Sequence, residues 1–236
     1  MLITVLRNSL FLVYILIITC FFSLIIVFLD LLRFSYSKKI LLVKTWSVFS
    51  KLGMKFFLNL SYKVENHNNF VERAIYVSNH QSIWETIVLC SLIRNPCFVL
   101  KKEILSLPLF GKALLAIDSI AIAREKTLSS LKRVIEKGSR KIDSGANIII
   151  FPEGKRVSIG NIVEFHKSAF VLSKKTNCMV VPIAHNSGKF WPRKFGLIKP
   201  GCVSITFGSP IRNTKALSVE EIRNSCATWI SSRIQY

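Results

Sequence analysis

Acidic residues are scarce in this chain of 236 residues. Its 13 Asp and Glu residues stand against 33 Lys and Arg residues, which gives a formal net charge of +20. A surface with this charge suits nucleic acid, an anionic bilayer or a phosphorylated substrate. Half of the residues are hydrophobic and the mean hydropathy is +0.41, so charge and hydropathy together favour the membrane among these partners.

Several motifs that define enzyme classes are also missing. The six cysteines are scattered, without a Cys-x-x-Cys pair, so we predict no metal site and interpret them as small hydrophobic residues in a reducing compartment. The sequence has no GxGxxG, GxSxG or HExxH pattern, and Gly111-Lys112 and Gly154-Lys155 lack the first glycine of a P-loop. These absences weigh against ATP hydrolysis, the common serine hydrolase architecture and zinc peptidase chemistry.

Charged residues are absent from residues 10–29, which read LFLVYILIITCFFSLIIVFL. As a helix this run would be about 30 Å long, the thickness of a hydrocarbon core. The first alanine in the chain is Ala74, so no Ala-x-Ala cleavage site follows the run. We therefore expect an anchor that is kept, not a signal peptide that is removed.

Basic residues dominate the flank that follows this anchor. Asp30 is the only acid among residues 30–59, and Arg7 is the only basic side chain before the run. The positive-inside bias predicts a protein of the cytoplasmic (inner) membrane whose remaining chain faces the cytoplasm. Residues 40–60 mix aromatic residues with spaced lysines, which is typical of a helix lying on headgroups. The two segments could instead form a helical hairpin that dips into one leaflet, and the sequence does not separate these arrangements.

The rest of the chain reads as one domain, which gives a division into 1–59 and 60–236. Short β-rich runs alternate with helical patterns, and this predicts an α/β sheet covered by helices. The predicted strands are residues 60–65, 74–78, 97–100, 119–123, 147–151, 179–184 and 202–207. The predicted helices are residues 85–94, 128–143 and a last helix that begins at a capping box, Ser218 to Glu221.

The stretch NHQSIWET, residues 79–86, follows the second predicted strand and has two interpretations. Ser82 and Glu85 fit a capping box at the start of a helix, which needs no function. Alternatively, Glu85 reaches back to His80, fixes its tautomer and stabilises the imidazolium, as in a Ser-His-Asp arrangement without its serine. The activated hydroxyl would then belong to the substrate. His185 is a rival without a carboxylate nearby in sequence, and we interpret it, with His67 and His166, as structural or surface.

Four blocks in their observed order resemble the glycerolipid acyltransferase family, specifically the 1-acyl-sn-glycerol-3-phosphate acyltransferases. NHQSIWE resembles the family pattern N-H-x4-D. KKEILSLPLFGKAL, followed by IDSIAIAR, resembles K-x-E-L-x-x-x-P-x-x-G with its later arginine. FPEGKR resembles FPEGTR, and VVPIAHNSG resembles the apolar V-P-[IV] block. The blocks span about residues 75–188, and their combination is more specific than any one of them.

The resemblance implies roles for the matching residues. His80 matches the catalytic histidine and Glu85 its acidic partner. The positions that match substrate-binding residues are Arg124, Glu153, Gly154, Lys155 and Arg156. In this role Glu153 would hold the neighbouring cations or the loop.

The chain departs from the family pattern at three positions. Glu85 replaces the commoner Asp and adds one methylene. Lys155 replaces Thr, which removes a hydroxyl and adds a cation. Ala123 stands where an Asp often precedes the arginine. The central functional groups are retained, and Lys155 bears mainly on the headgroup preference.

The resemblance implies a mixed, largely parallel sheet flanked by helices, as in glycerol-3-phosphate acyltransferases, and a 1-acylglycerol-3-phosphate O-acyltransferase. His80, oriented by Glu85, would be the general base on the sn-2 hydroxyl of lysophosphatidate. That hydroxyl would attack an acyl thioester and give phosphatidate. We expect acyl-CoA or acyl carrier protein as co-substrate, no metal or other cofactor, membrane phospholipids as surroundings and no nucleic acid partner.

Two alternatives stay open. One is an acyltransferase for another lysolipid or for glycerol 3-phosphate. The other is an inert, membrane-tethered protein that binds anionic lipid or nucleic acid, for which His80 would be dispensable.

Overall fold

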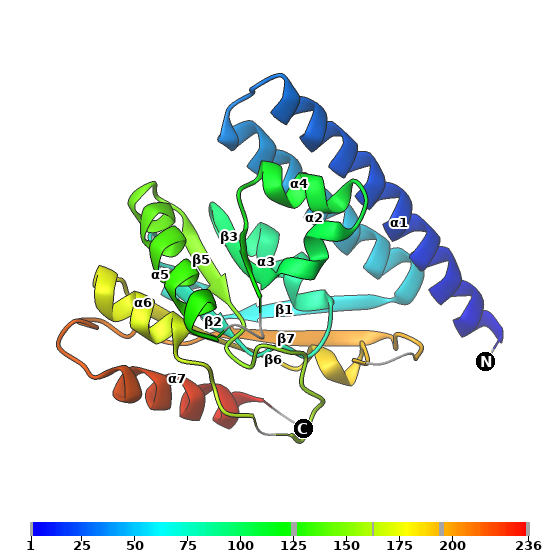
Figure 1. Cartoon of the computed structure of the whole chain (residues 1–236). Coiled ribbons are helices and arrows are strands. Elements are labelled where there is room, and N and C mark those ends of the chain that lie inside the picture. Colours follow the sequence, from blue (N-terminus) through cyan, green and yellow to red (C-terminus); the bar gives the residue numbers. More distant parts are fainter. Residues whose placement is uncertain (1, 124–126, 162, 194–195, 235–236) are drawn as a thin grey trace.

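The computed structural model describes residues 2–123, 127–161, 163–193 and 196–234, which form a seven-stranded sheet flanked by helices (Figure 1). The strand order is β1-β7-β6-β2-β5-β3-β4. The strands are β1 (Leu60–Glu65), β2 (Ile75–Ser78), β3 (Pro96–Lys101), β4 (Ile120–Ile122), β5 (Asn147–Ile150), β6 (Val180–His185) and β7 (Gly201–Phe207). All seven predicted strands are confirmed within one or two residues at each end.

The sheet is mixed and largely parallel, as expected. Every strand pair is parallel except β6 and β7, which are antiparallel, so β1 and β7 run opposite to the other strands. Each residue of β2, β5 and β6 is buried, because helices cover both faces of the sheet. These three central strands are neighbours, and the segments that follow them leave the sheet at one edge.

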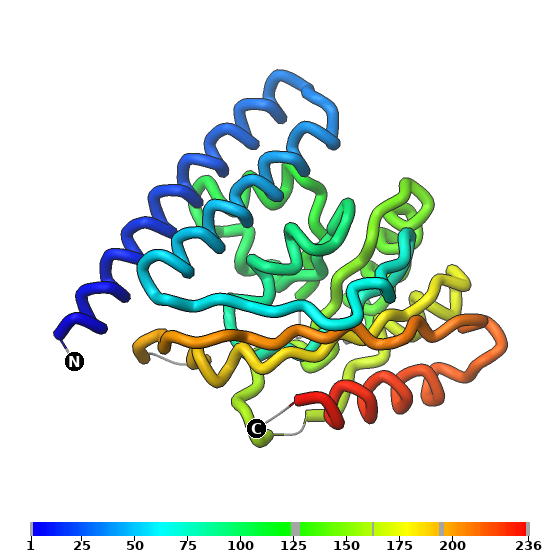
Figure 2. The backbone as a smooth tube through the Cα atoms, turned by 180° about the vertical axis from the view of Figure 1, so that it is seen from behind, coloured from blue at the N-terminus to red at the C-terminus, as the bar shows by residue number. Residues whose placement is uncertain are grey.

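Helices pack on both faces of the sheet (Figures 1 and 2). They are α1 (Leu2–Leu31), α2 (Tyr36–Leu58), α3 (Trp84–Leu92), α4 (Phe110–Ala116), α5 (Thr127–Asp143), α6 (Ser168–Thr176) and α7 (Val219–Arg233), with short 3-10 helices η1 (His67–Asn69), η2 (Lys102–Ser106) and η3 (Ser187–Lys189). One buried core lies between the sheet and α1, α2 and α3, and a second lies between the sheet and α5, α6 and α7.

The N-terminal helices α1 and α2 form an antiparallel hairpin that packs against the sheet (Figure 2). Phe11 and Met54 belong to the same buried core as the strand residue Val203. The indole Nε1 of Trp46 donates a hydrogen bond of 3.0 Å to Thr19 Oγ1 and joins the two helices. The hairpin is therefore part of the folded body in this structure.

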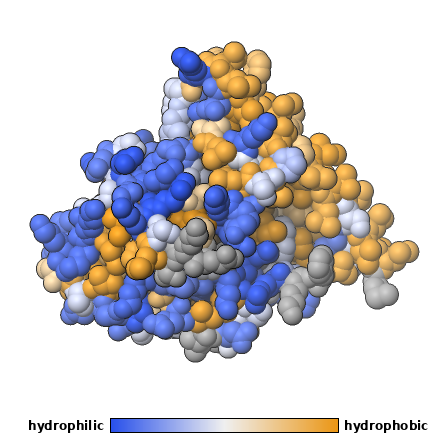
Figure 3. Space-filling view, viewed as in Figure 1, coloured by the Kyte–Doolittle hydropathy of each residue, from blue (hydrophilic) through white to orange (hydrophobic). Residues whose placement is uncertain are grey.

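One helix of the described chain, α1, is long and apolar enough to cross a membrane by length and composition. Its 18-residue window of highest hydropathy is only 17% buried, and leucine and isoleucine side chains such as Leu16 and Ile17 are more than half exposed. Figure 3 shows this apolar surface along the helix. A surface of this extent needs a further apolar contact.

Two predicted helix starts have different outcomes. The capping box of α7 is confirmed, since Ser218 Oγ accepts from Glu221 N–H while the Glu221 carboxylate accepts from Ser218 N–H. The predicted start at Ser82 is confirmed only in part, because α3 begins at Trp84 with Ile83 as N-cap, while the Ser82 hydroxyl accepts from Trp84 N–H.

Candidate active site

His80 and Glu85 form a close pair at the edge of the sheet where β2 ends. His80 follows β2 after one intervening residue, and Glu85 lies in the first turn of α3. The Nδ1 atom of His80 lies 2.8 Å from Oε1 of Glu85. The Glu85 side chain is fully buried, whereas that of His80 is 17% exposed. The carboxylate of the pair is therefore fixed in the interior, whereas the imidazole is partly accessible to solvent.

The Glu85 carboxylate accepts hydrogen bonds on both of its oxygens. Oε1 also accepts from the main-chain N–H groups of Gln81, at 2.7 Å, and Ser82, at 2.8 Å. Oε2 accepts from the hydroxyl of Ser82, at 2.6 Å, and from that of Ser187, at 3.0 Å. Such donors compensate for burying a charge. Burial alone would raise the pKa of Glu85, but the electrostatic influence of His185 and the hydrogen bonds from His80 and Ser82 lower it below its ordinary value.

The same hydrogen bonds explain why a helix-capping pattern and a His–Glu pair occur in the same residues. Glu85 bonds the Ser82 N–H, as the acid of a capping box does. However, the Ser82 hydroxyl donates to Glu85 and accepts from Trp84 N–H instead of capping Glu85 N–H. Both readings of NHQSIWET therefore describe part of one network.

The tautomer of His80 follows from its partner. A carboxylate can only accept, so Nδ1 carries the proton of the neutral ring and Nε2 retains its lone pair. Among the residues that the structure describes, none forms a hydrogen bond with Nε2. The ring stacks on Phe151, with centroids 4.3 Å apart and planes at 18°. His80 is thus oriented by two neighbours and presents a free base.

Glu153 contacts the main chain of His80. Its Oε2 accepts from His80 N–H at 2.7 Å, and Val157 N–H donates to the His80 carbonyl at 2.7 Å. Burial raises the pKa of Glu153 to about 8, the Glu85 charge adds to the rise, and the bond from His80 opposes it. No ion pair joins Glu153 to Lys155 or Arg156, so the geometry fits the prediction that Glu153 holds the loop, and the prediction that it holds cations stays untested for Arg124, which lies outside the described residues.

The loop after β5 also places the other residues of its block. Gly154 has φ +67°, and a Cβ there would lie 2.9 Å from Nε2 of His166, so only glycine fits without strain. Lys155 is exposed and Arg156 half-buried, and within the described ranges neither has an ion-pair partner. Arg124 lies outside the described residues. The geometry therefore leaves two cations of this loop free to meet an anion.

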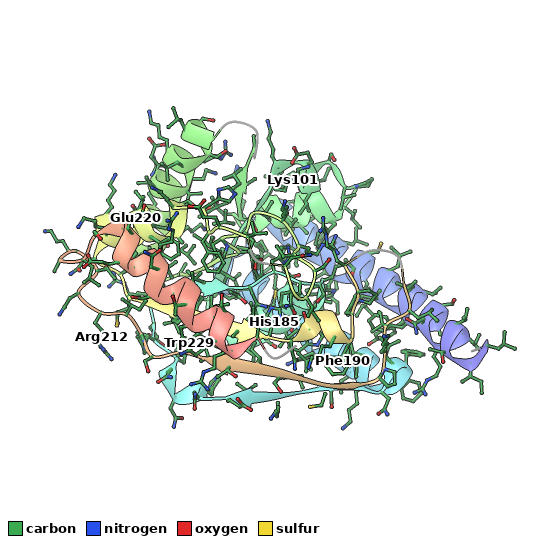
Figure 4. All side chains as sticks on the ribbon, turned by 90° about the horizontal axis from the view of Figure 1, so that it is seen from below. Lys101, His185, Phe190, Arg212, Glu220 and Trp229 are labelled. Carbon is green, nitrogen blue, oxygen red and sulfur yellow. The ribbon has the colours of Figure 1, made fainter. Side chains whose placement is uncertain are left out.

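His185 is buried, and both of its ring nitrogens contact the main chain. Its Nε2 lies 2.8 Å from the Asn79 carbonyl, and its Nδ1 accepts from Ser187 N–H at 3.3 Å. Burial lowers the pKa of His185, so the ring is neutral. In Figure 4 it lies in the middle of the molecule, whereas Arg212 and Glu220 lie at the edge. The described residues contain no group of three His, Cys, Asp or Glu side chains arranged to hold a metal.

Sequence reasoning assigned no role to Phe151 or Ser187. Each comes shortly after a central strand, β5 or β6, and this position was the one available signal. A single serine or phenylalanine has no signature of its own, so the contacts with His80 and Glu85 became visible only in three dimensions.

Comparisons with known proteins agree with the four blocks. The family model described as Acyltransferase matches residues 61–186. A 1-acyl-sn-glycerol-3-phosphate acyltransferase of Pseudomonas aeruginosa is 30% identical over 192 residues, which cover 80% of this chain and 75% of that protein. A chloroplastic 1-acyl-sn-glycerol-3-phosphate acyltransferase of Brassica napus is 34% identical over 159 residues, which cover 65% of this chain and 45% of the longer plant protein.

A solved structure has the same fold. The crystal structure of the 1-acyl-sn-glycerophosphate (LPA) acyltransferase PlsC from Thermotoga maritima superposes with a TM-score of 0.78, over 98% of this chain and 95% of that chain. The sequence identity is 19%. The similarity therefore includes the N-terminal hairpin as well as the sheet.

Proposed function

This chain belongs to the acyltransferase family, and from that premise we propose that it transfers a fatty acyl group from an acyl thioester to the sn-2 hydroxyl of 1-acyl-glycerol 3-phosphate, giving phosphatidate. The names of the similar proteins support this acceptor. The observation that carries the chemistry is the His80–Glu85 pair, with Nδ1 held at 2.8 Å and Nε2 open.

His80 is the general base of the proposed reaction. Its Nε2 removes the proton of the acceptor hydroxyl as the oxygen attacks the thioester carbonyl. The tetrahedral intermediate collapses, the carbon–sulfur bond breaks, and the thiolate takes the proton back from Nε2. General-base catalysis of this kind typically increases the reaction rate about 10²–10⁴-fold. Glu85 is a positioning residue that stabilises the imidazolium formed in between.

Arg156 and Lys155, with Arg124, bind the acceptor's phosphate in this proposal. Guanidinium groups form paired, charge-assisted bonds with phosphate oxygens. The Glu153 carboxyl lies in the same loop, and its pKa of about 8 keeps it neutral near pH 7. A neutral carboxyl does not repel a phosphate dianion, so burial of Glu153 suits an anionic substrate. The donor, acyl-CoA or acyl carrier protein, stays open, and no step requires a metal or a bound cofactor.

We place the hairpin in one leaflet of the cytoplasmic membrane, with the sheet on the cytoplasmic side. α1 contacts the rest of the fold near both of its ends. Asn8 exchanges two hydrogen bonds with the main chain of Ile198, and Ile26 packs with Cys90 and Ala113. A helix bound to one body at both ends does not cross a bilayer away from that body. Its exposed side chains instead face lipid, where lysophosphatidate resides.

The test uses purified full-length protein in detergent and follows thiol release from acyl-CoA with and without lysophosphatidate. We expect release that depends on lysophosphatidate in the wild type and near-complete loss in folded His80→Ala. A panel of lysolipids and glycerol 3-phosphate separates the acceptors. Full activity of His80→Ala would overturn the mechanism, and salt-sensitive lipid binding without any turnover would favour an inert binding protein.

A further inference from the structure

We propose that η2 and α4 form a second contact with an anionic bilayer, beside the hairpin and at the edge of the sheet where β2 ends and His80 lies. This inference rests on the proposed function for its substrate. It concerns the second sequence block, to which the reaction gives no role apart from its later arginine. The surface in question consists of Lys102, Leu107, Lys112 and Leu115, and it is called the η2–α4 surface below.

The apolar side chains of this surface face outward. Leu107 is 51% exposed and Leu115 is 57% exposed. Outside α1 and α2, few large apolar side chains of the described chain are more than half exposed, and the others are Leu32 and Leu128. Ile83, in the block that holds His80, is 46% exposed. Exposed leucines are costly in water unless something apolar covers them. Because η2 follows β3 at the edge of the sheet where β2 ends and His80 lies, the membrane that holds the substrate is the cover we propose.

The lysines of this surface indicate an anionic partner. Lys102 and Lys112 are exposed, and neither has an ion-pair partner among the residues described. Lys112 and Leu115 are three positions apart on α4 and share one face of the helix. Alternating lysine and leucine suits an interface in which leucines enter the acyl region and lysines meet anionic headgroups. Charge and apolar surface therefore point to lipid.

The η2–α4 surface is continuous with the hairpin. α4 packs on α1, and Ala113 shares an apolar cluster with Ile26 of α1. In Figure 3 the apolar surface of α1 extends onto the region of α4, with hydrophilic side chains set into it. A membrane that covers α1 therefore lies close to α4 as well.

The backbone between η2 and α4 has an unusual conformation that fixes the position of this surface. Leu109 has φ 62° and ψ −57°, and Phe110 N–H bonds the Pro108 carbonyl at 2.6 Å, which is a γ-turn that leucine rarely adopts. Gly111 allows α4 to lie on η2, since a Cβ there would be 2.0 Å from the Leu105 carbonyl oxygen. Strain of this kind concentrates where a fixed geometry serves a function.

The experiment compares two forms of the acceptor with the full-length protein and acyl-CoA. One form is long-chain lysophosphatidate in vesicles that contain anionic phospholipid, and the other is a short-chain lysophosphatidate that is monomeric in water. We expect the paired variant Leu107→Asp with Leu115→Asp to lose about tenfold or more in kcat/KM on vesicles. Its kcat/KM on the monomeric acceptor should stay within about twofold. Leu128→Asp, at a leucine of α5 that is still more exposed, at 83%, is the control and should lose neither.

A second readout does not depend on turnover. Leu107→Trp should add fluorescence that brominated phospholipids in the same vesicles quench, and Leu128→Trp should add fluorescence that they do not quench. If the wild type has no activity while this quenching is seen, the surface stands and the proposed function fails. Equal losses on both acceptor forms, or absent quenching, would overturn the proposal.

Discussion

The most direct prediction concerns Glu85→Gln. The amide oxygen of Gln can keep its place at Oε1, because the N–H groups of Gln81 and Ser82 both point there and an NH2 group would clash with them. His80 therefore keeps its tautomer, and the amide can donate to the rotatable hydroxyls of Ser82 and Ser187. The change removes mainly the negative charge.

The size of the effect follows from the short distance. The two charge centres lie about 4 Å apart, and at an effective dielectric constant of about 20 their attraction is worth about 4 kcal/mol. Only the imidazolium feels it, so the loss falls on kcat, and we expect a decrease of about 10²–10³-fold. The assay is thiol release at saturating lysophosphatidate, with the melting temperature as a check of folding. A folded variant with kcat within about threefold of wild type would refute the role of the carboxylate.

Three further predictions follow from the site. Ser187→Ala removes one hydroxyl from Oε2 of Glu85, and kcat should fall about three- to tenfold, whereas the control Ser204→Ala should leave kcat unchanged. Arg156→Ala should raise the KM for lysophosphatidate about tenfold or more with little change in kcat, and an unchanged KM would exclude Arg156 from the phosphate site. Glu153 has its pKa raised from 4.5 to about 8, so the stability it contributes is full below about pH 4.5 and is lost as pH rises through about 8. The melting temperature of the wild type should therefore fall more steeply between about pH 5 and 8.5 than that of Glu153→Gln, and parallel curves would contradict the assignment.

The strands were predictable because their signal is local. The run of residues 74–77, AIYV, is hydrophobic over its whole length and ends at Ser78, as strands covered on both faces do. The helices α4 and α6 were not predicted, because seven and nine residues give too few turns for a clear period. The helix α3 is also nine residues long, but the S-x-x-E pattern of Ser82 and Glu85 marked its start. Local sequence patterns therefore predicted the strands better than the helices that cover the sheet.

The site was predictable only in part. His80 and Glu85 are five positions apart, and one turn of chain brings them together. Ser187 is 102 positions from Glu85, and its contact depends on β2 and β6 being neighbours in the sheet. The packing of α1 against the rest of the fold could not be predicted for another reason. Residues 10–29 are apolar on every face, so hydropathy cannot show which face packs on protein.

The pairing of β1 with β7 has a consequence for how the protein is made. Glu65 pairs in register with Thr206, 141 positions later, and β1 has no other neighbour in the sheet (Figure 2). At about 5–20 residues per second, a ribosome needs roughly 10–30 s to synthesise the interval. The hairpin and β1 therefore leave the ribosome long before β7, the partner of β1, has been synthesised. During that time the main-chain N–H and C=O groups of β1 have no partner strand next to the newly made hairpin. They become paired when β7 is synthesised.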